Sequence, residues 1–139
     1  MTTTLTPNLM TEDVNASIRF YCSYLGFSFQ MGLPFGTETP VNEMSEDVPL
    51  QFAMLEREGA MLMFQHRRSL AEECGLFTEM PVAASATCYL EVSNLDELLA
   101  GLGGDVETVM PERVTFYGMR EMWIRDNNGY IVTLAQKQV

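Results

Sequence analysis

Histidine, cysteine and basic residues are scarce in this sequence: it has one histidine, three cysteines, and eight basic residues against 19 acidic ones. The net charge of −11 argues against a nucleic-acid partner, because phosphate binding needs a basic surface. Three cysteines with no CxxC spacing argue against a disulfide framework or a zinc knuckle. The acidic excess either keeps the protein soluble or attracts a cationic ligand or partner.

Long apolar runs are also missing, so the sequence predicts no membrane span and no membrane partner. Its first residues place no basic segment before an apolar one, which argues against a secretory signal. We therefore expect a cytoplasmic protein. A length of 139 residues with 47% hydrophobic residues predicts a single domain over residues 1–139.

The single histidine restricts the catalytic chemistry that is possible. No metal triad of two histidines and a carboxylate can form within one chain, and a Ser–His–acid triad would need His66 as its base. No serine has the flanking residues of a nucleophile elbow. His66 stands at the end of an expected strand beside Arg67 and Arg68, so a strand-end position at the surface is favoured over a catalytic role.

Hydrophobic periodicity predicts the element order βαβββ in the first half of the chain. A strand is expected at 5–10, a helix at 14–25 behind capping residues at 11–13, and strands at 27–31, 50–55 and 60–65. The intervening residues 32–48 are rich in Gly, Pro, Glu and Asn and predict a long loop. These elements define a first module at about residues 4–66.

The second half repeats this order. A capping box from Ser69 to Glu72 predicts a linker helix at about 69–80. The second module, at about residues 84–136, is expected to contain a strand at 86–92, a helix at 94–102 and strands at 105–109, 116–125 and 130–135. Shifted by 81 positions, Val14 meets Leu95 and Ile18 meets Leu99, which indicates two similar units.

The two modules together predict the fold class. We expect an α+β protein in which two βαβββ modules form curved mixed sheets around a central cavity, with the helices on the outer faces. Each helix would cover one face of its sheet, and the opposite face would have to bury something else.

Motifs at both ends of the chain resemble one known family. The segments 13–21 and 25–27 are similar to the opening helix of the vicinal-oxygen-chelate superfamily, which includes glyoxalases, bleomycin-resistance proteins and extradiol dioxygenases. The segments 116–121 and 126–130 resemble its closing hairpin, although two asparagines replace the usual Asp-Pro-Asp-Gly pattern. The resemblance covers residues 4–136.

Enzymes of that superfamily hold a divalent metal with histidine and glutamate, one ligand from each of four strands. The resemblance places the four positions at Thr6, Met63, Thr87 and Thr133. Neutral hydroxyls and a thioether are poor ligands without carboxylate or imidazole company. We therefore expect a member that has lost the metal ligands and that uses no metal and no other cofactor.

Residues at the expected cavity positions predict an apolar pocket with aromatic walls. They include Met10, Met54, Met61, Met63 and Met119, beside Phe52, Tyr89, Phe116 and Trp123. Glu91 and Glu121 would pair with a ligand cation, act as a general base, or lie in water at the rim. The expected ligand-binding residues are Phe52, Met63, Gln65, Tyr89, Glu91, Glu121 and Trp123.

Three functional hypotheses follow. The resemblance favours a metal-independent small-molecule-binding protein, similar to bleomycin-resistance members that sequester a drug in the grooves of a dimer, with an apolar or cationic aromatic ligand such as an antibiotic. The alternative is a lyase, isomerase or dioxygenase that uses a carboxylate base or atypical metal ligands. A regulatory or protein-binding domain is the third. Open sheet edges and the resemblance both predict a homodimer.

Overall fold

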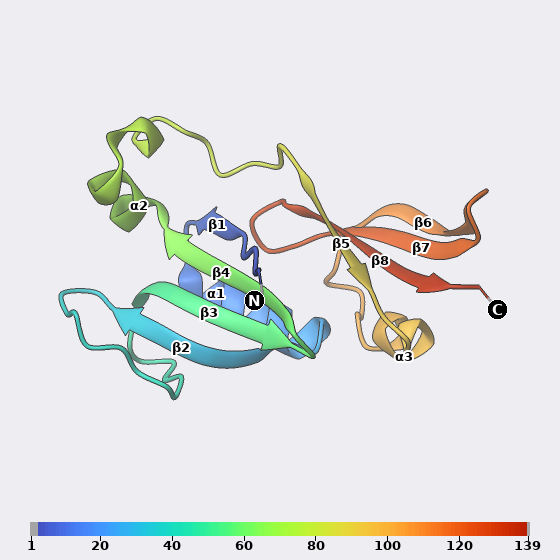
Figure 1. The fold of residues 1–139 in the computed structure, drawn as a ribbon, viewed down its shortest axis with the longest axis horizontal. Coiled ribbons are helices and arrows are strands. Elements are labelled where there is room, and N and C mark those ends of the chain that lie inside the picture. Colours follow the sequence, from blue (N-terminus) through green and yellow to red (C-terminus); the bar gives the residue numbers. More distant parts are fainter. Residues whose placement is uncertain (1–2, 139) are drawn as a thin grey trace. The chain divides into compact units, whose positions relative to one another are not determined.

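A computed structural model describes residues 3–138 and shows the predicted α+β fold (Figure 1). The order βαβββ occurs twice, with a short helical segment between the two copies. The elements are β1 (Asn8–Thr11), α1 (Val14–Tyr24), β2 (Ser28–Pro34), β3 (Leu50–Arg57), β4 (Ala60–His66), α2 (Arg67–Glu73), the 3₁₀ helix η1 (Gly75–Phe77), β5 (Thr87–Glu91), α3 (Leu95–Ala100), β6 (Thr108–Val114), β7 (Met119–Arg125) and β8 (Ile131–Lys137). The chain divides into two compact units, residues 1–82 and 83–139, and each is described by itself.

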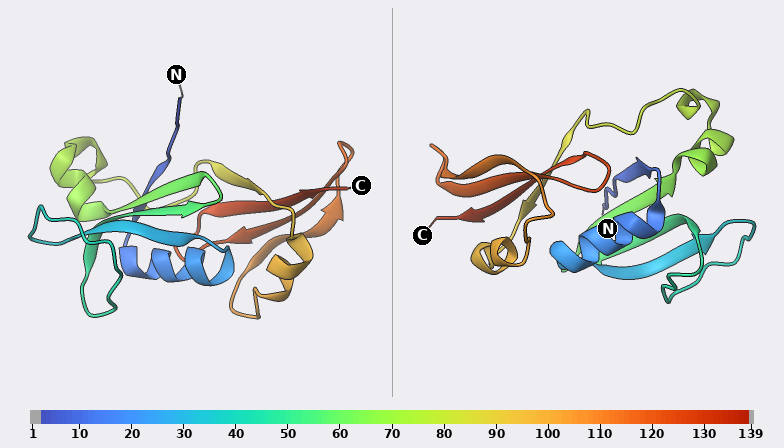
Figure 2. Two further views of the ribbon diagram at one scale, coloured as in Figure 1. Left: turned by 60° about the horizontal axis from the view of Figure 1, so that its bottom comes forward. Right: turned by 180° about the vertical axis from the view of Figure 1, so that it is seen from behind.

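The first unit is a four-stranded sheet in the order β1-β4-β3-β2, in which only β1 and β4 run parallel. Helix α1 lies along one face of this sheet (Figure 2). Alternation along each strand sends one set of side chains toward α1 and the next set to the opposite face. The core beneath α1 contains Val14, Ile18, Tyr21, Leu25, Ala53, Leu55, Leu62 and Phe64.

Side-chain hydrogen bonds hold the N-terminal end of α1. Asp13 is the N-cap, and its carboxylate accepts a hydrogen bond from the backbone N–H of Ala16 over 3.1 Å. The buried Asn15 donates to the carbonyl of Val48 and accepts from the N–H of Leu50, each over 3.0 Å. Asn15 therefore anchors the end of the long loop to the helix.

The second unit repeats the topology, with the order β5-β8-β7-β6 and only β5 and β8 parallel. Helix α3 packs on β8, and the backbone N–H of Leu95 donates to Gln136 over 2.8 Å. The first helical residues, Val14 and Leu95, are separated by the predicted offset of 81. In the turn before β8, the Asp126 carboxylate accepts hydrogen bonds from two backbone N–H groups, and Gly129 has φ +91°.

The linker helix begins earlier than the capping box predicts, at Arg67 instead of Ser69. His66 is the N-cap, because its Nδ1 accepts the backbone N–H of Arg68 over 3.0 Å. Ser69 is buried and bonds to the side chains of Gln65 and Gln51 instead of to a helix start. The Ser69 hydroxyl is therefore used by Gln65 and Gln51 and does not cap a helix, which is why the predicted helix start is wrong.

Several strand ends also differ from the prediction. β1 begins at Asn8 instead of residue 5 and lies at a sheet edge. β6 occupies Thr108–Val114 instead of 105–109. Phe116 lies in a turn closed by Gly118 (φ +80°) and is fully exposed, so its assignment to an aromatic pocket wall is wrong. Between residues 3 and 138, every helix is too short or too polar to cross a bilayer.

Candidate functional site

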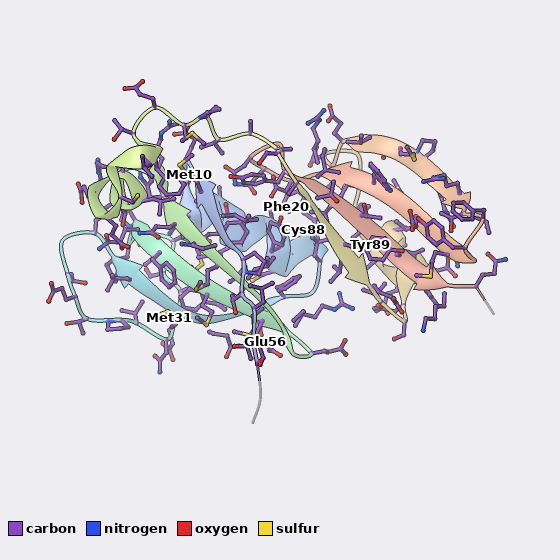
Figure 3. All side chains as sticks on the ribbon, turned by 45° about the horizontal axis from the view of Figure 1, so that its top comes forward. Met10, Phe20, Met31, Glu56, Cys88 and Tyr89 are labelled. Carbon is purple, nitrogen blue, oxygen red and sulfur yellow. The ribbon has the colours of Figure 1, made fainter. Side chains whose placement is uncertain are left out.

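The seven expected ligand-binding residues fall on two sheet faces. Phe52, Met63 and Gln65 lie on the face of the first sheet opposite α1. Side chains along β3 alternate between the two faces, and Arg57 belongs to the set that points to α1, where it donates a hydrogen bond to the carbonyl of Leu25. On the second sheet, the face opposite α3 holds the other four: Tyr89, Glu91, Glu121 and Trp123. Figure 3 marks Tyr89 on β5.

Glu121 is the centre of the second group. It is 1% exposed, and its Oε2 accepts hydrogen bonds from the hydroxyls of Tyr89 and Tyr117, each over 2.6 Å. Its Oε1 lies 3.5 Å from Nε1–H of Trp123 and 3.8 Å from a guanidinium nitrogen of Arg113. A buried carboxylate needs such partners, and here most of them are the polar ends of aromatic side chains.

Protonation in this group follows from its contacts. Burial alone would raise the pKa of the Glu121 carboxyl, but hydrogen bonds from Tyr117, Tyr89 and Trp123 and the charge of Arg113 together hold that pKa below its ordinary value. Burial and its hydrogen bond to Glu121 raise the pKa of Tyr89. The separate hydrogen bond from Tyr117 to Glu121 raises the pKa of Tyr117. At neutral pH the carboxylate is ionised and both phenols keep their protons.

Gln65 is the centre of the first group and is 4% exposed. Its Oε1 accepts a hydrogen bond from Asn8 over 2.9 Å, and its Nε2 donates to Ser69 over 3.0 Å and to Glu73 over 2.9 Å. Ser69 donates in turn to Gln51 over 3.0 Å. These residues meet because β4 leads directly into α2, which places Ser69 and Glu73 above the end of the strand.

A pocket of about 480 Å³ opens beside Gln65 within the first unit. This volume lies in the range of small-molecule sites. Its apolar lining residues are Met31, Leu33, Pro40 and Phe52, and its polar ones are Asn8, Glu38, Gln51, Gln65, Ser69 and Glu73. Met31 is labelled on β2 in Figure 3. Phe52 and Gln65 are thus the two predicted residues that line this pocket.

The donor set at the four family metal positions does not fit a divalent metal. Strand register pairs Met63 with Asn8 and Thr133 with Tyr89, so Thr6 and Thr87 are not the residues opposite them. With either assignment the donors are neutral hydroxyls, an amide or a thioether, with no carboxylate or imidazole. Within residues 3–138, no group of three or more His, Cys, Asp or Glu side chains is arranged to hold a metal ion.

Several members of these groups were not predicted from the sequence. Tyr117 precedes Glu121 by four residues in the closing hairpin, and that proximity was the only signal available. Asn8 lies on the same strand face as Met10, a predicted cavity residue, so strand alternation could have indicated Asn8. Nothing in the sequence pattern indicated Glu73. Glu91, which was predicted, is exposed on the same strand face as Tyr89.

His66 lies outside the group around Gln65 and lines a different pocket of the first unit. It borders a separate pocket of about 380 Å³ with Glu12, Asp13 and Phe35. Its Nδ1 is used to cap α2, and its ring packs edge-on against Phe35 at 5.1 Å between centroids. These contacts give His66 a structural role at a strand end.

The fold is shared with solved structures of one family. A glyoxalase/bleomycin resistance protein/dioxygenase family enzyme from Burkholderia phytofirmans PsJN is 12% identical, with a TM-score of 0.71 over 95% of this chain and 96% of that one. A glyoxalase/bleomycin resistance protein/dioxygenase from Nocardioides is 20% identical, with a TM-score of 0.66 over 99% and 85%. For a glyoxalase-related enzyme from Fulvimarina pelagi the values are 18% and 0.66, over 99% and 89%.

The sequence itself matches no protein-family model and no curated protein. At these identities the structural likeness shows the fold alone. The chain has the vicinal-oxygen-chelate fold of glyoxalase and bleomycin-resistance proteins, as its opening helix and closing hairpin predict. Fold does not determine function.

Proposed function

We propose that this chain is a metal-independent small-molecule-binding protein of the glyoxalase/bleomycin-resistance type. The observation that carries the proposal is the pocket of about 480 Å³ in the first unit, which combines an apolar lining with a buried amide. Ligand sites generally combine these two features, since apolar walls contribute affinity and a few placed polar groups orient the ligand. The donor set at the family metal positions supports a function without metal.

Binding is favoured over catalysis by the state of Glu121. A general base works best when its pKa lies near the operating pH. The contacts of Glu121 lower its pKa instead, which makes the carboxylate a weaker base. A lyase, isomerase or dioxygenase of this fold that uses a carboxylate base is the second candidate. The observation that favours it is the burial of the ionised Glu121.

The proposed ligand is apolar or a cationic aromatic compound, such as an antibiotic. In the first unit Phe52 and Gln65 would contact it in the pocket, and Met63 lies on the same sheet face outside the pocket lining. In the second unit the ligand-binding surface would consist of Tyr89, Trp123 and Glu91, with Glu121 fixing the two rings. A cation over an aromatic ring adds about 0.5–2 kcal/mol, depending on desolvation.

A ligand screen tests this function. The full chain is titrated by calorimetry with cationic aromatic and glycopeptide antibiotics and with neutral aromatic compounds. We expect binding that Phe52→Ala weakens by about tenfold, because the ring forms part of the pocket wall. Leu76→Ala, at an exposed position on η1 of the same unit, is the matched control and should leave binding unchanged. Absence of binding throughout the panel would refute the proposal and favour a regulatory or protein-binding domain.

A further inference from the structure

We infer that the pocket of the first unit selects a protonated amine or amidine with an apolar body, and that Glu73 is the partner of its positive charge. This inference rests on the proposed function and names the ligand class of that pocket. It assigns the charge recognition to α2, which the sequence pattern did not indicate.

The geometry of Glu73 is fixed by Gln65. The Nε2 of Gln65 donates to Oε1 of Glu73 over 2.9 Å, and Gln65 is itself held by Asn8 and Ser69. Among residues 3–138, the second oxygen of Glu73 has no hydrogen-bond partner. A buried amide thus orients an otherwise exposed carboxylate at the pocket while leaving one oxygen available.

The side-chain carbonyl of Asn8 is a second acceptor beside Gln65. Asn8 donates its Nδ2–H to Oε1 of Gln65, and this bond fixes the orientation of the Asn8 amide. The side-chain carbonyl of Asn8 has no partner among the described residues. Both groups line the pocket, and both accept hydrogen bonds. A ligand group with several N–H donors matches them, whereas a quaternary ammonium has no N–H to donate.

The charge of the lining agrees with this assignment. Two carboxylates, Glu38 and Glu73, line the pocket, and no arginine, lysine or histidine of the described residues does. The nearby cation, Arg68, borders an adjoining pocket and lies 4.5 Å over the Phe35 ring. A cationic ligand would therefore meet only negative charge, and an anionic one would be repelled.

The apolar lining sets the rest of the ligand. Met31, Leu33 and Phe52 offer a surface for a ring or a hydrocarbon chain. Methionine adapts to irregular shapes and an aromatic ring stacks or faces a cation, so this wall accepts a flat or flexible body. The ligand class is an arylalkylamine or arylamidine.

Four probes with one apolar body separate these contributions. Phenylbutylamine, phenylbutyl-trimethylammonium, phenylbutanol and phenylpentanoate are titrated against the full chain, with chemical shifts of the methionine methyl groups as the readout. The amine should bind about tenfold more tightly than the alcohol, since the alcohol offers one O–H donor and no positive charge to the Glu73 carboxylate. The trimethylammonium compound should be weaker than the amine, and the carboxylate weakest.

Variants assign the effect to Glu73. Glu73→Gln should remove the preference for the amine over the alcohol, and Glu38→Gln should reduce it. Glu79→Gln, an exposed position in the same unit, is the control. Thermal melting verifies that each variant is folded.

The outcomes separate the two proposals. Equal binding of amine and alcohol, or indifference of the amine to Glu73→Gln, would overturn the cation assignment. Binding of the alcohol that Phe52→Ala weakens would still support the pocket as a ligand site. If none of the four probes shifts the methionine methyl signals, both the ligand class and this pocket's role are refuted.

Discussion

The hydroxyl groups of Tyr89 and Tyr117 donate to the same atom, Oε2 of Glu121, each over 2.6 Å. Tyr89 belongs to β5 and Tyr117 to the turn before β7, so one buried carboxylate ties a strand to a turn. Both side chains are about half exposed, at 50% and 53%. Their rings therefore present aromatic surface while their hydroxyls point to a buried charge.

Removing either hydroxyl should destabilise the fold. Tyr89→Phe should lower the free energy of unfolding by about 1 kcal/mol, because a hydrogen bond to a charged group is lost and solvent screens it at a half-exposed side chain. Tyr117→Phe should lower the free energy of unfolding for the same reason. Urea unfolding measures this change. Tyr24→Phe is the control, since the ring of Tyr24 packs on Phe20 and is kept in this variant, and it should change stability by less than about 0.5 kcal/mol. Tyrosine variants as stable as this control would contradict the prediction.

Glu121 should make stability depend on pH in the acid range. Its folded-state pKa is lowered, so the unfolded chain binds a proton more readily. The stabilisation is then fully present above the ordinary glutamate pKa of about 4.3 and is lost as pH falls through the folded-state value. The stability difference between wild type and Glu121→Gln should shrink below about pH 4. A difference that is constant with pH would show that the carboxylate is not specifically stabilised.

Much of the fold could be predicted from the sequence because it depends on periodic apolar residues. Val14, Ile18 and Tyr21 are all buried beneath the helix that their spacing predicts. The offset of 81 also locates the start of α3 correctly. Helix and strand ends were less predictable where a side chain had a second possible partner, as Ser69 has in Gln65 and Gln51.

The candidate site was only partly predictable for a related reason. Strand alternation places Glu121, Tyr89 and Gln65 on the faces opposite the helices. Their hydrogen-bond partners Tyr117 and Glu73 come from a turn and from a short helix, where no periodicity applies. Phe116 and Tyr117 show the same limit. They are neighbours in one turn, yet Phe116 is fully exposed while the hydroxyl of Tyr117 donates to the buried carboxylate of Glu121.

His66 should give a second pH dependence near neutrality. Burial and the nearby Arg68 lower the pKa of His66, and its neutral Nδ1 is the acceptor that caps α2. Because the folded-state pKa is lowered, this stabilisation is present above the ordinary value of about 6.5 and is lost as pH falls through the folded-state pKa. His66→Asn keeps a capping oxygen at every pH. Wild type should therefore lose stability relative to His66→Asn on acidification, and parallel pH profiles would refute the capping role.

A homodimer remains a prediction of the open sheet edges. β6 is an edge strand of the second sheet, and Val109 and Val114 on it are exposed, as is Phe116 beyond it. Unpaired edges with exposed apolar residues invite association. Sedimentation equilibrium at micromolar concentration should give twice the chain mass of 15.7 kDa, and Val114→Lys should shift the protein toward the monomer. A monomer at that concentration in the wild type would contradict the dimer.

Divalent metals should leave the protein unaffected. The four family positions hold threonines and a methionine, and the strand-register partners Asn8 and Tyr89 add only an amide and a phenol. Neutral donors of this kind bind zinc, nickel, manganese or iron poorly in the absence of carboxylate or imidazole ligands.

A metal that bound only the folded state would raise the melting temperature as its concentration rises. We therefore expect the same melting temperature with each metal and with a chelator, and less than stoichiometric metal by elemental analysis after gentle purification. One metal per chain that disappears in Glu91→Gln or Glu121→Gln would overturn this expectation, because those are the carboxylates on the face of the second sheet opposite α3.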